Sequence, residues 1–338
     1  MCIFSAIVEG VRPVRYSNVV VDRVRSWAAT IVFLPVFALV LVVFDVAQRC
    51  ARLFGQRPQE YVAGALQVAL VWAFHLCGTR LYVDRAPGVE RGGRYIVVSN
   101  HQSMFDIPIL GSLLFANYPK YISKRSLGRW IPSVSYNLRR GGHVLIERSD
   151  APAALAAIRE LGARVRGGQA SAVIFPEGTR SRHGTLGKFK RAGTLALLEE
   201  APDAPVLPVV IDESWRLLCH NFLPVPWGVR VYVRLGPPIA RQPGEDPATL
   251  LDRVHDEIAA TLAHRRAASG ASRVDEHAVA AAPFGLGASG DLQFSRSAVM
   301  EAGSSCLCAS PSRPFPRRSV HAQQLRQNSR RPEEGPGV

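Results

Sequence analysis

Residues 95–106 read YIVVSNHQSMFD and join a short apolar run to a polar turn that carries a histidine and an aspartate. Tyr95–Ser99 has the composition of a buried strand, and the polar residues begin where that strand is expected to end. His101 and Asp106 are too far apart in sequence to be neighbours on one helix face. A turn between them would let Asp106 accept a hydrogen bond from one imidazole nitrogen and leave the other nitrogen as a base.

A second polar turn follows another apolar run. Residues 175–181 read FPEGTRS and come directly after the candidate strand Ala172–Phe175. Gly178 permits a close backbone approach, and the guanidinium of Arg180 offers the planar pair of donors that suits a phosphate. Taken alone, each motif also fits a purely structural interpretation: a helix-capping loop for the first, and a surface turn with a solvated arginine for the second.

Around these motifs, residues 79–266 alternate between short β-rich runs and helical segments, which predicts an α/β domain with a largely buried sheet. Helices are expected over Ala151–Arg166, Lys190–Glu200 and Ala248–Arg266, where apolar residues recur near helical spacing. The expected strands are Arg80–Val83, Tyr95–Ser99, Lys120–Ser123, His143–Glu147, Ala172–Phe175, Val206–Ile211 and Val229–Arg234.

The N-terminal segment, residues 1–78, contains two apolar stretches. Trp27–Phe44 is an uncharged run of 18 residues, so we predict a membrane helix over about 27–46. The stretch 61–78 contains Gln67 and His75, and its pattern fits an interfacial or hairpin-returning helix as well as a buried helix of the domain. Basic residues flank the first run on both sides, which favours a hairpin lying in one leaflet. A cleaved signal peptide is the alternative, although no A-x-A cleavage pattern follows the run.

The rest of the sequence limits the classes of partner and site. In residues 267–338, Ser, Pro and Gly make up 24 of 72 positions, which predicts a disordered tail. The six cysteines are scattered, so neither a disulfide framework nor a metal site is expected. A net charge of +14 favours an anionic partner. Because zinc spacings, RNA-binding motifs and recognition helices are missing from the sequence, we expect a phosphate-bearing substrate or an acidic bilayer, and no nucleic acid.

Together the two motifs closely resemble those of the 1-acyl-glycerol-3-phosphate acyltransferase family of glycerolipid synthesis. The resemblance covers roughly residues 80–240 and includes several blocks in the family's order. Leu145 departs from the family pattern, because a Phe is frequent at its place. The blocks are Asn100–Asp106, Lys124–Pro132, Gly142–Arg148, Phe175–Ser181, Val206–Val210 and Leu235–Ile239.

The resemblance implies a mixed sheet flanked by helices, a membrane-embedded helical hairpin, and transfer of a fatty acyl group. The donor would be acyl-CoA or acyl-ACP (acyl carrier protein), and the acceptor the free hydroxyl of a lysophosphatidic acid-like lysophospholipid, without a cofactor or metal. His101 would be the general base and Asp106 its orienting carboxylate. By resemblance the protein would sit in the inner (cytoplasmic) membrane, with its catalytic domain facing the cytoplasm and contacting membrane lipid. The residues implied to hold the acceptor are Glu177, Gly178, Thr179 and Arg180, with Lys124 and Arg148 as further contacts.

Three other functions remain open at the level of sequence. Ser103 would be the nucleophile of a hydrolase or a ping-pong transferase, although no G-x-S-x-G elbow surrounds it. The acceptor could instead be glycerol 3-phosphate, another lysophospholipid or a lyso-aminolipid, because relatives share both motifs. A non-enzymatic basic protein that binds a membrane surface also fits the charge.

Overall fold

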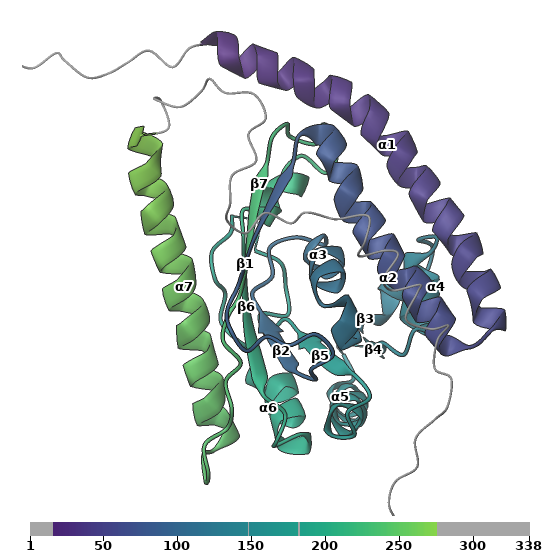
Figure 1. Cartoon of the computed structure of the whole chain (residues 1–338), viewed down its shortest axis with the longest axis vertical. Coiled ribbons are helices and arrows are strands. Elements are labelled where there is room, and N and C mark those ends of the chain that lie inside the picture. Colours follow the sequence, from purple (N-terminus) through teal and green to yellow (C-terminus); the bar gives the residue numbers. More distant parts are fainter. Residues whose placement is uncertain (1–15, 148, 182, 276–338) are drawn as a thin grey trace, which may run out of the picture. The chain divides into compact units, whose positions relative to one another are not determined.

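The computed structural model describes residues 16–147, 149–181 and 183–275 (Figure 1). Its centre is a seven-stranded sheet with the order β1-β7-β6-β2-β5-β3-β4. Strands β6 and β7 are antiparallel and the other neighbouring pairs are parallel, which confirms the mixed sheet. The strands are β1 (Arg80–Arg85), β2 (Ile96–Ser99), β3 (Pro119–Lys124), β4 (Val144–Ile146), β5 (Ser171–Ile174), β6 (Val206–Asp212) and β7 (Arg230–Leu235).

The central strands are apolar on both faces because helices cover both sides of the sheet. Successive side chains of a strand point to opposite faces. Val97 of β2 therefore packs into one apolar core, while Ile96 and Val98 pack into the other. All four residues of β2 are buried. Parallel strands that are covered on both faces have continuous apolar sequences, which is why these strands could be predicted from the sequence.

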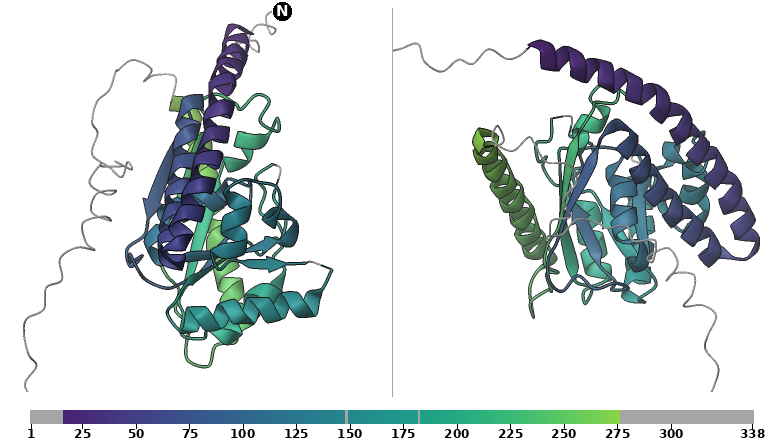
Figure 2. Two further views of the ribbon diagram at one scale, coloured as in Figure 1. Left: turned by 90° about the vertical axis from the view of Figure 1, so that its right-hand side faces the viewer. Right: turned by 45° about the horizontal axis from the view of Figure 1, so that its top comes forward.

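Each core is closed by its own set of helices. The first contains apolar residues of α1 (Tyr16–Leu53), α2 (Gln56–Ala73), η1 (Phe74–Cys77) and α3 (Asp106–Leu113). The second contains those of α5 (Ala151–Arg166), α6 (Arg191–Glu200) and α7 (Pro247–Asp275). Figures 1 and 2 show α1 and α2 on one side of the sheet and α7 on the other. The short helices are η2 (Phe115–Asn117), η3 (Arg125–Gly128), α4 (Val134–Arg140) and η4 (Ser214–Leu218).

The two N-terminal helices form a hairpin that turns at Gly55. Glycine suits this position because its φ of 119° is one that other residues rarely adopt. Two segments, Val20–Leu53 and Gln56–Cys77, are long and apolar enough to cross a membrane by length and composition. The first helix has 38 residues, well beyond the about 20 that a bilayer core requires.

Helix α1 packs along the α/β domain rather than standing apart from it. Nearer its start, the Ser26 hydroxyl accepts a hydrogen bond from the backbone N–H of Trp227 at 2.9 Å. In its middle, Phe33 is fully buried against the ring of Phe74, with 4.8 Å between ring centroids. Near its end, the Gln48 side chain donates to the Ser133 hydroxyl at 2.5 Å. Its other side is apolar and exposed, with Val24, Ile31, Val42 and Val46 each more than half accessible.

The sequence predicted the regular elements well and some of their boundaries poorly. All seven expected strands and the helices over α5 and α6 are present. Helix α4 was not expected, and α7 continues to Asp275, beyond the predicted end at Arg266. Helix α1 is longer at both ends than the predicted 27–46, because its apolar stripe continues between charged residues. The remainder of the predicted tail, residues 276–338, lies outside the described residues.

Candidate active site

His101 and Asp106 meet in the turn between β2 and α3. Nδ1 of His101 lies 2.9 Å from Oδ2 of Asp106. The same carboxylate oxygen accepts the backbone N–H groups of Gln102 at 2.7 Å and Ser103 at 2.8 Å. The other oxygen accepts the hydroxyl of Ser214 at 2.6 Å. Asp106 is fully buried, so this polar cage is what holds a carboxylate inside the domain.

This geometry fixes the tautomer of the histidine. An ionised carboxylate only accepts hydrogen bonds, so Nδ1 of His101 must carry the proton that Asp106 receives. In the neutral ring, Nε2 is then the atom with a free lone pair, which is the requirement for a general base. The ring also stacks on Phe175, with 4.1 Å between centroids, which restricts its rotation. The imidazole is 14% exposed, so a substrate can reach it.

Glu177 joins the two motifs through the backbone. One carboxylate oxygen accepts the N–H of His101 at 2.8 Å, and the other accepts the N–H of Gly187 at 2.9 Å. Burial raises the pKa of this carboxyl, and the two backbone N–H groups oppose that rise. Both oxygens of Glu177 thus hold the backbone, one of them at His101 itself. The acceptor contact that the resemblance implies for Glu177 stays a prediction.

The turn that follows β5 presents two cationic side chains, Arg180 and Lys190. Gly178 has a φ of +67°, and the Lys190 ammonium lies 3.2 Å from where a Cβ would stand. Because glycine has no Cβ, Lys190 can pack closely against the turn. Thr179 and Arg180 are exposed at the tip. The backbone N–H of Ser181 donates to the His101 carbonyl at 2.8 Å, which places the turn directly beside the histidine. Among the described residues, neither Arg180 nor Lys190 forms an ion pair.

The sheet brings these segments to one edge. The carboxyl ends of parallel strands meet at the same edge, where α/β proteins bind their ligands. Strand β2 leads to His101 and the neighbouring β5 leads to Glu177. Lys124 ends β3, which pairs with the far side of β5; its side chain is exposed, and among the described residues it makes no hydrogen bond or ion pair with either motif. Arg148 lies outside the described residues.

The catalytic turn is supported by three residues far from it in sequence, which are Ser214, Ile211 and Arg266. Ser214, at the start of η4, holds Asp106, as described above. Asn100 bonds both the N–H and the carbonyl of Ile211 in β6, at 2.8 and 2.7 Å. From α7, Arg266 donates to the buried Asp212 at 2.9 Å and to the Gly184 carbonyl at 2.6 Å. No local pattern in the sequence could have identified these partners, because each bond joins distant segments.

Arg266 shares its acceptors with the catalytic turn. The side-chain amide of Gln102, next to His101, also donates to the Gly184 carbonyl at 3.2 Å and approaches the Asp212 carboxylate at 3.4 Å. Gly184 belongs to the same loop as Arg180. Helix α7 therefore fastens the loop of the second motif to the turn of the first.

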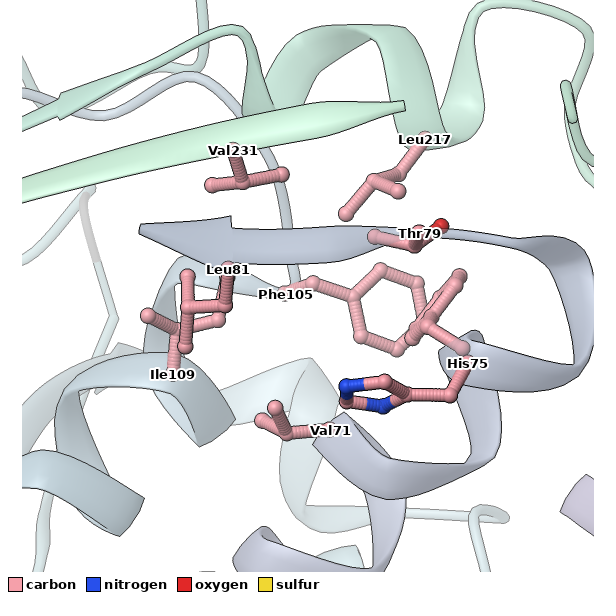
Figure 3. Close-up of a pocket in the computed structure, with 9 residues that line it drawn as sticks. Val71, His75, Thr79, Leu81, Phe105, Ile109, Leu217 and Val231 are labelled. Carbon is pink, nitrogen blue, oxygen red and sulfur yellow. The ribbon is translucent and has the colours of Figure 1, made fainter. Parts of the chain in front are cut away.

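Phe105, directly before Asp106, is surrounded by apolar groups. Its ring contacts Phe37 of α1 at 6.0 Å and Phe74 of η1 at 4.4 Å between centroids. Figure 3 shows a small pocket beside it, lined by residues of α2, η1, β1, α3, η4 and β7. The lining is apolar except for His75 and Thr79, so it suits a hydrocarbon group and not a phosphate.

Ser103 does not have the environment of a nucleophile. Its side chain is 1% exposed, and its hydroxyl accepts the N–H of Phe105 at 3.3 Å. Its own N–H is part of the Asp106 cage. An activated serine would instead share a proton with the histidine and be open to substrate.

The geometry agrees with what the chain is similar to. The Acyltransferase family model matches residues 80–212, which include both motifs. A 1-acyl-sn-glycerol-3-phosphate acyltransferase alpha of Homo sapiens is 30% identical over 196 residues, covering 57% of this chain and 67% of the relative. The sheep (Ovis aries) alpha enzyme is 31% identical over 197 residues, covering 57% of this chain and 66% of the relative. The Escherichia coli K12 enzyme is 29% identical over 176 residues, covering 51% and 67%.

A solved structure shares the fold. The 1-acyl-sn-glycerophosphate acyltransferase PlsC of Thermotoga maritima aligns with a TM-score of 0.58 at 22% identity, over 73% of this chain and 98% of that one. The matched region of this chain spans about two thirds of the length of its curated relatives. With its buried His–Asp pair and the adjoining basic turn inside the matched residues, the chain belongs to the 1-acyl-sn-glycerol-3-phosphate acyltransferase family.

Proposed function

We propose that this protein transfers a fatty acyl group from a thioester donor, acyl-CoA or acyl-ACP, to the free hydroxyl of lysophosphatidic acid, forming phosphatidic acid. The single observation that carries the proposal is the His101–Asp106 pair, which lies beside the turn that carries the exposed Arg180. A base alone would serve many acceptors. A base next to an exposed guanidinium favours an alcohol that also bears a phosphate.

The reaction follows from the state of the imidazole. Nε2 of His101 removes the proton of the acceptor hydroxyl while the oxygen attacks the thioester carbonyl. The tetrahedral intermediate then expels the thiolate as the carbon–sulfur bond breaks, and the imidazolium returns its proton to that thiolate. The negative charge of Asp106 stabilises the imidazolium that forms in between. A thioester is already activated, so this sequence requires no cofactor.

The phosphate is assigned to the turn after β5. Arg180 can bind two phosphate oxygens at once, and Lys190 adds a second positive charge across Gly178. The pocket beside Phe105 is too apolar for a phosphate. Its position against the catalytic turn supports a role for that wall in contacting an acyl chain.

Membrane association follows from the acceptor and from the N-terminal hairpin. Lysophosphatidic acid with its acyl chain resides in a bilayer, and α1 presents an exposed apolar side along a helix that is packed on the domain. We assign the protein to the cytoplasmic face of the inner membrane, where soluble acyl thioesters reach it. The hairpin then lies in the leaflet that holds the acceptor.

The test is a transfer assay with purified protein in lipid vesicles, one labelled acyl-CoA and a panel of acceptors. The panel contains lysophosphatidic acid, lysophosphatidylcholine, glycerol 3-phosphate and monoacylglycerol. Lysophosphatidic acid should be the preferred acceptor, and Arg180→Ala should raise its KM about tenfold to a hundredfold, as expected for loss of a charge-assisted hydrogen bond. The KM for acyl-CoA should change little.

Arg191→Ala is the matched control, because it removes the same charge from a residue that is paired with Asp252 at 3.0 Å. It should leave the KM for lysophosphatidic acid within a few-fold of wild type. Equal use of monoacylglycerol and lysophosphatidic acid would contradict the phosphate role. So would an equal rise of both KM values in Arg180→Ala.

A further inference from the structure

The segment 124–132, called the Trp130 segment below, connects the carboxyl end of β3 to α4. Trp130 is 94% exposed, the highest fraction among the large apolar side chains of the described residues, and Leu53 follows at 85%. Leu127 in the same segment is 37% exposed. The indole is one of the largest apolar surfaces that a side chain can bury, and Trp130 leaves almost all of it accessible.

The segment is held in place from several directions. The Ser135 hydroxyl accepts the N–H of Ile131 at 3.0 Å and donates to the Leu127 carbonyl at 3.1 Å. Ser133, three residues after Trp130, donates its N–H to the Asp45 carboxylate of α1 at 2.6 Å. Trp130 itself adopts a φ of 72°, which a non-glycine residue rarely does. The tryptophan is therefore presented outward by a fixed loop.

The surroundings of Trp130 are strongly basic. Between Lys124 and Ile146 the sequence has five basic residues and no acidic one. Lys124, Arg125 and Arg129 are exposed around the tryptophan. Tryptophan together with arginine is the combination found where proteins meet the headgroup region of a bilayer.

The apolar side of α1 continues this surface. Asp45 holds the segment, and the side chains of Val42, about one turn before Asp45, and of Val46, directly after it, are more than half exposed. The Trp130 segment thus sits beside the outward apolar side of a helix long enough to enter a membrane. A protein partner would have to cover both the arginines and this helix, whereas an anionic bilayer matches both at once.

We infer that the Trp130 segment is a second membrane anchor beside the N-terminal hairpin, and that its ligand is the surface of an anionic bilayer. Trp130 and Leu127 enter the headgroup region, and Lys124, Arg125 and Arg129 contact lipid phosphates. Because the segment leaves the carboxyl end of β3, this contact turns the sheet edge that carries His101 toward the lipid. The inference concerns orientation on the bilayer and goes beyond the identity of the acceptor.

Tryptophan fluorescence tests this inference in the full-length protein. Trp27, Trp72, Trp215 and Trp227 are replaced by Phe so that Trp130 is the sole emitter. The protein is bound to vesicles of phosphatidylcholine with or without phosphatidylglycerol, each with brominated or ordinary acyl chains. The control has Trp130 replaced as well and carries Glu160→Trp, which places an exposed emitter on α5.

On anionic vesicles, Trp130 emission should shift to shorter wavelength and be quenched by brominated lipid at least twofold more than the control emitter. Arg125→Glu with Arg129→Glu, or added salt, should reduce that difference, while Arg91→Glu with Arg159→Glu should not. Sedimentation with vesicles confirms that every variant is bound. Unshifted, unquenched Trp130 emission in bound protein would overturn the inference, and so would equal quenching on neutral and anionic vesicles.

Discussion

At the scale of single residues, the site depends on the hydrogen bonds that the Asp106 carboxylate accepts. Its carboxylate accepts from His101, from two backbone N–H groups and from Ser214, so its orientation does not depend on its charge alone. An asparagine can keep the same arrangement, with its oxygen toward His101 and its amide toward the Ser214 hydroxyl. The substitution then removes the charge and reverses the hydrogen bond with Ser214, which now accepts from the amide, while the other hydrogen bonds stay.

Asp106→Asn should therefore fold normally and lower kcat about 10²–10⁴-fold, with little change in the KM for acceptor. The loss arises because an amide still holds Nδ1 but no longer stabilises the imidazolium. Ser214→Ala, which removes one bond to the carboxylate and keeps its charge, should cost less activity. Steady-state kinetics with a single acyl-CoA distinguishes the two. A kcat for Asp106→Asn within tenfold of wild type would contradict the assigned role.

At the scale of elements, the second motif relies on a helix outside the matched region. Arg266 of α7 donates both to the buried Asp212 and to the Gly184 carbonyl in the loop of Arg180. Without the guanidinium, a buried carboxylate loses its cation and the loop loses its attachment to α7. Arg266 is therefore a positioning residue for the turn that follows β5 and carries Arg180.

Arg266→Ala should raise the KM for lysophosphatidic acid more than tenfold and the KM for acyl-CoA far less, because the loop it holds carries Arg180. Arg266→Lys should rescue only in part, since an ammonium cannot reproduce the planar fork. The double variant Arg266→Ala with Asp212→Asn should recover stability, because the unpaired charge is gone. Equal rises in both KM values would show that Arg266 supports the fold as a whole and does not position the loop of Arg180.

The packing of β3 against β4 predicts a pH dependence. Desolvation by partial burial, with Lys120 and Arg164 nearby, lowers the pKa of His143 from 6.5 to about 3. The folded protein keeps this ring neutral down to about pH 3, whereas the unfolded chain takes up its proton near 6.5. Acidification between these values thus favours unfolding, by at most about 1.4 kcal/mol per pH unit.

Urea unfolding in detergent at a series of pH values checks this. His143→Gln keeps an acceptor for the Tyr121 N–H, which His143 now accepts at 3.1 Å, and removes the titration. Its stability should fall less steeply than that of wild type from pH 6.5 toward pH 4. Identical slopes for the two proteins would contradict the assignment.

The elements also show what sequence alone can predict. Strands β2 and β5 are buried on both faces and end in polar turns, so both the strands and the two motifs were visible as apolar runs followed by polar residues. Helix α4 was missed because it is one short stretch after Pro132 with little apolar periodicity. The roles of Glu177 and Arg266 were hidden because they depend on bonds between segments that only the fold brings together.

At the scale of the whole chain, the catalytic turn, the basic turn and the Trp130 segment lie at one edge of the sheet. The sheet edge with His101, the turn with Arg180 and the Trp130 segment all follow carboxyl ends of neighbouring parallel strands. Helix α1 reaches this region through Phe37, whose ring packs on Phe105 beside Asp106. The helix that we propose to lie in the bilayer thus packs directly against the catalytic turn.

The most direct test of the central claim is the rate of acyl transfer by His101→Ala. The substitution removes the imidazole and leaves the backbone bonds that His101 makes to Glu177 and Ser181. Vesicle-bound protein is supplied with labelled acyl-CoA and lysophosphatidic acid, and phosphatidic acid is measured. The account predicts that formation falls at least a hundredfold while vesicle binding is unchanged. Transfer within tenfold of wild type by the folded variant would contradict it.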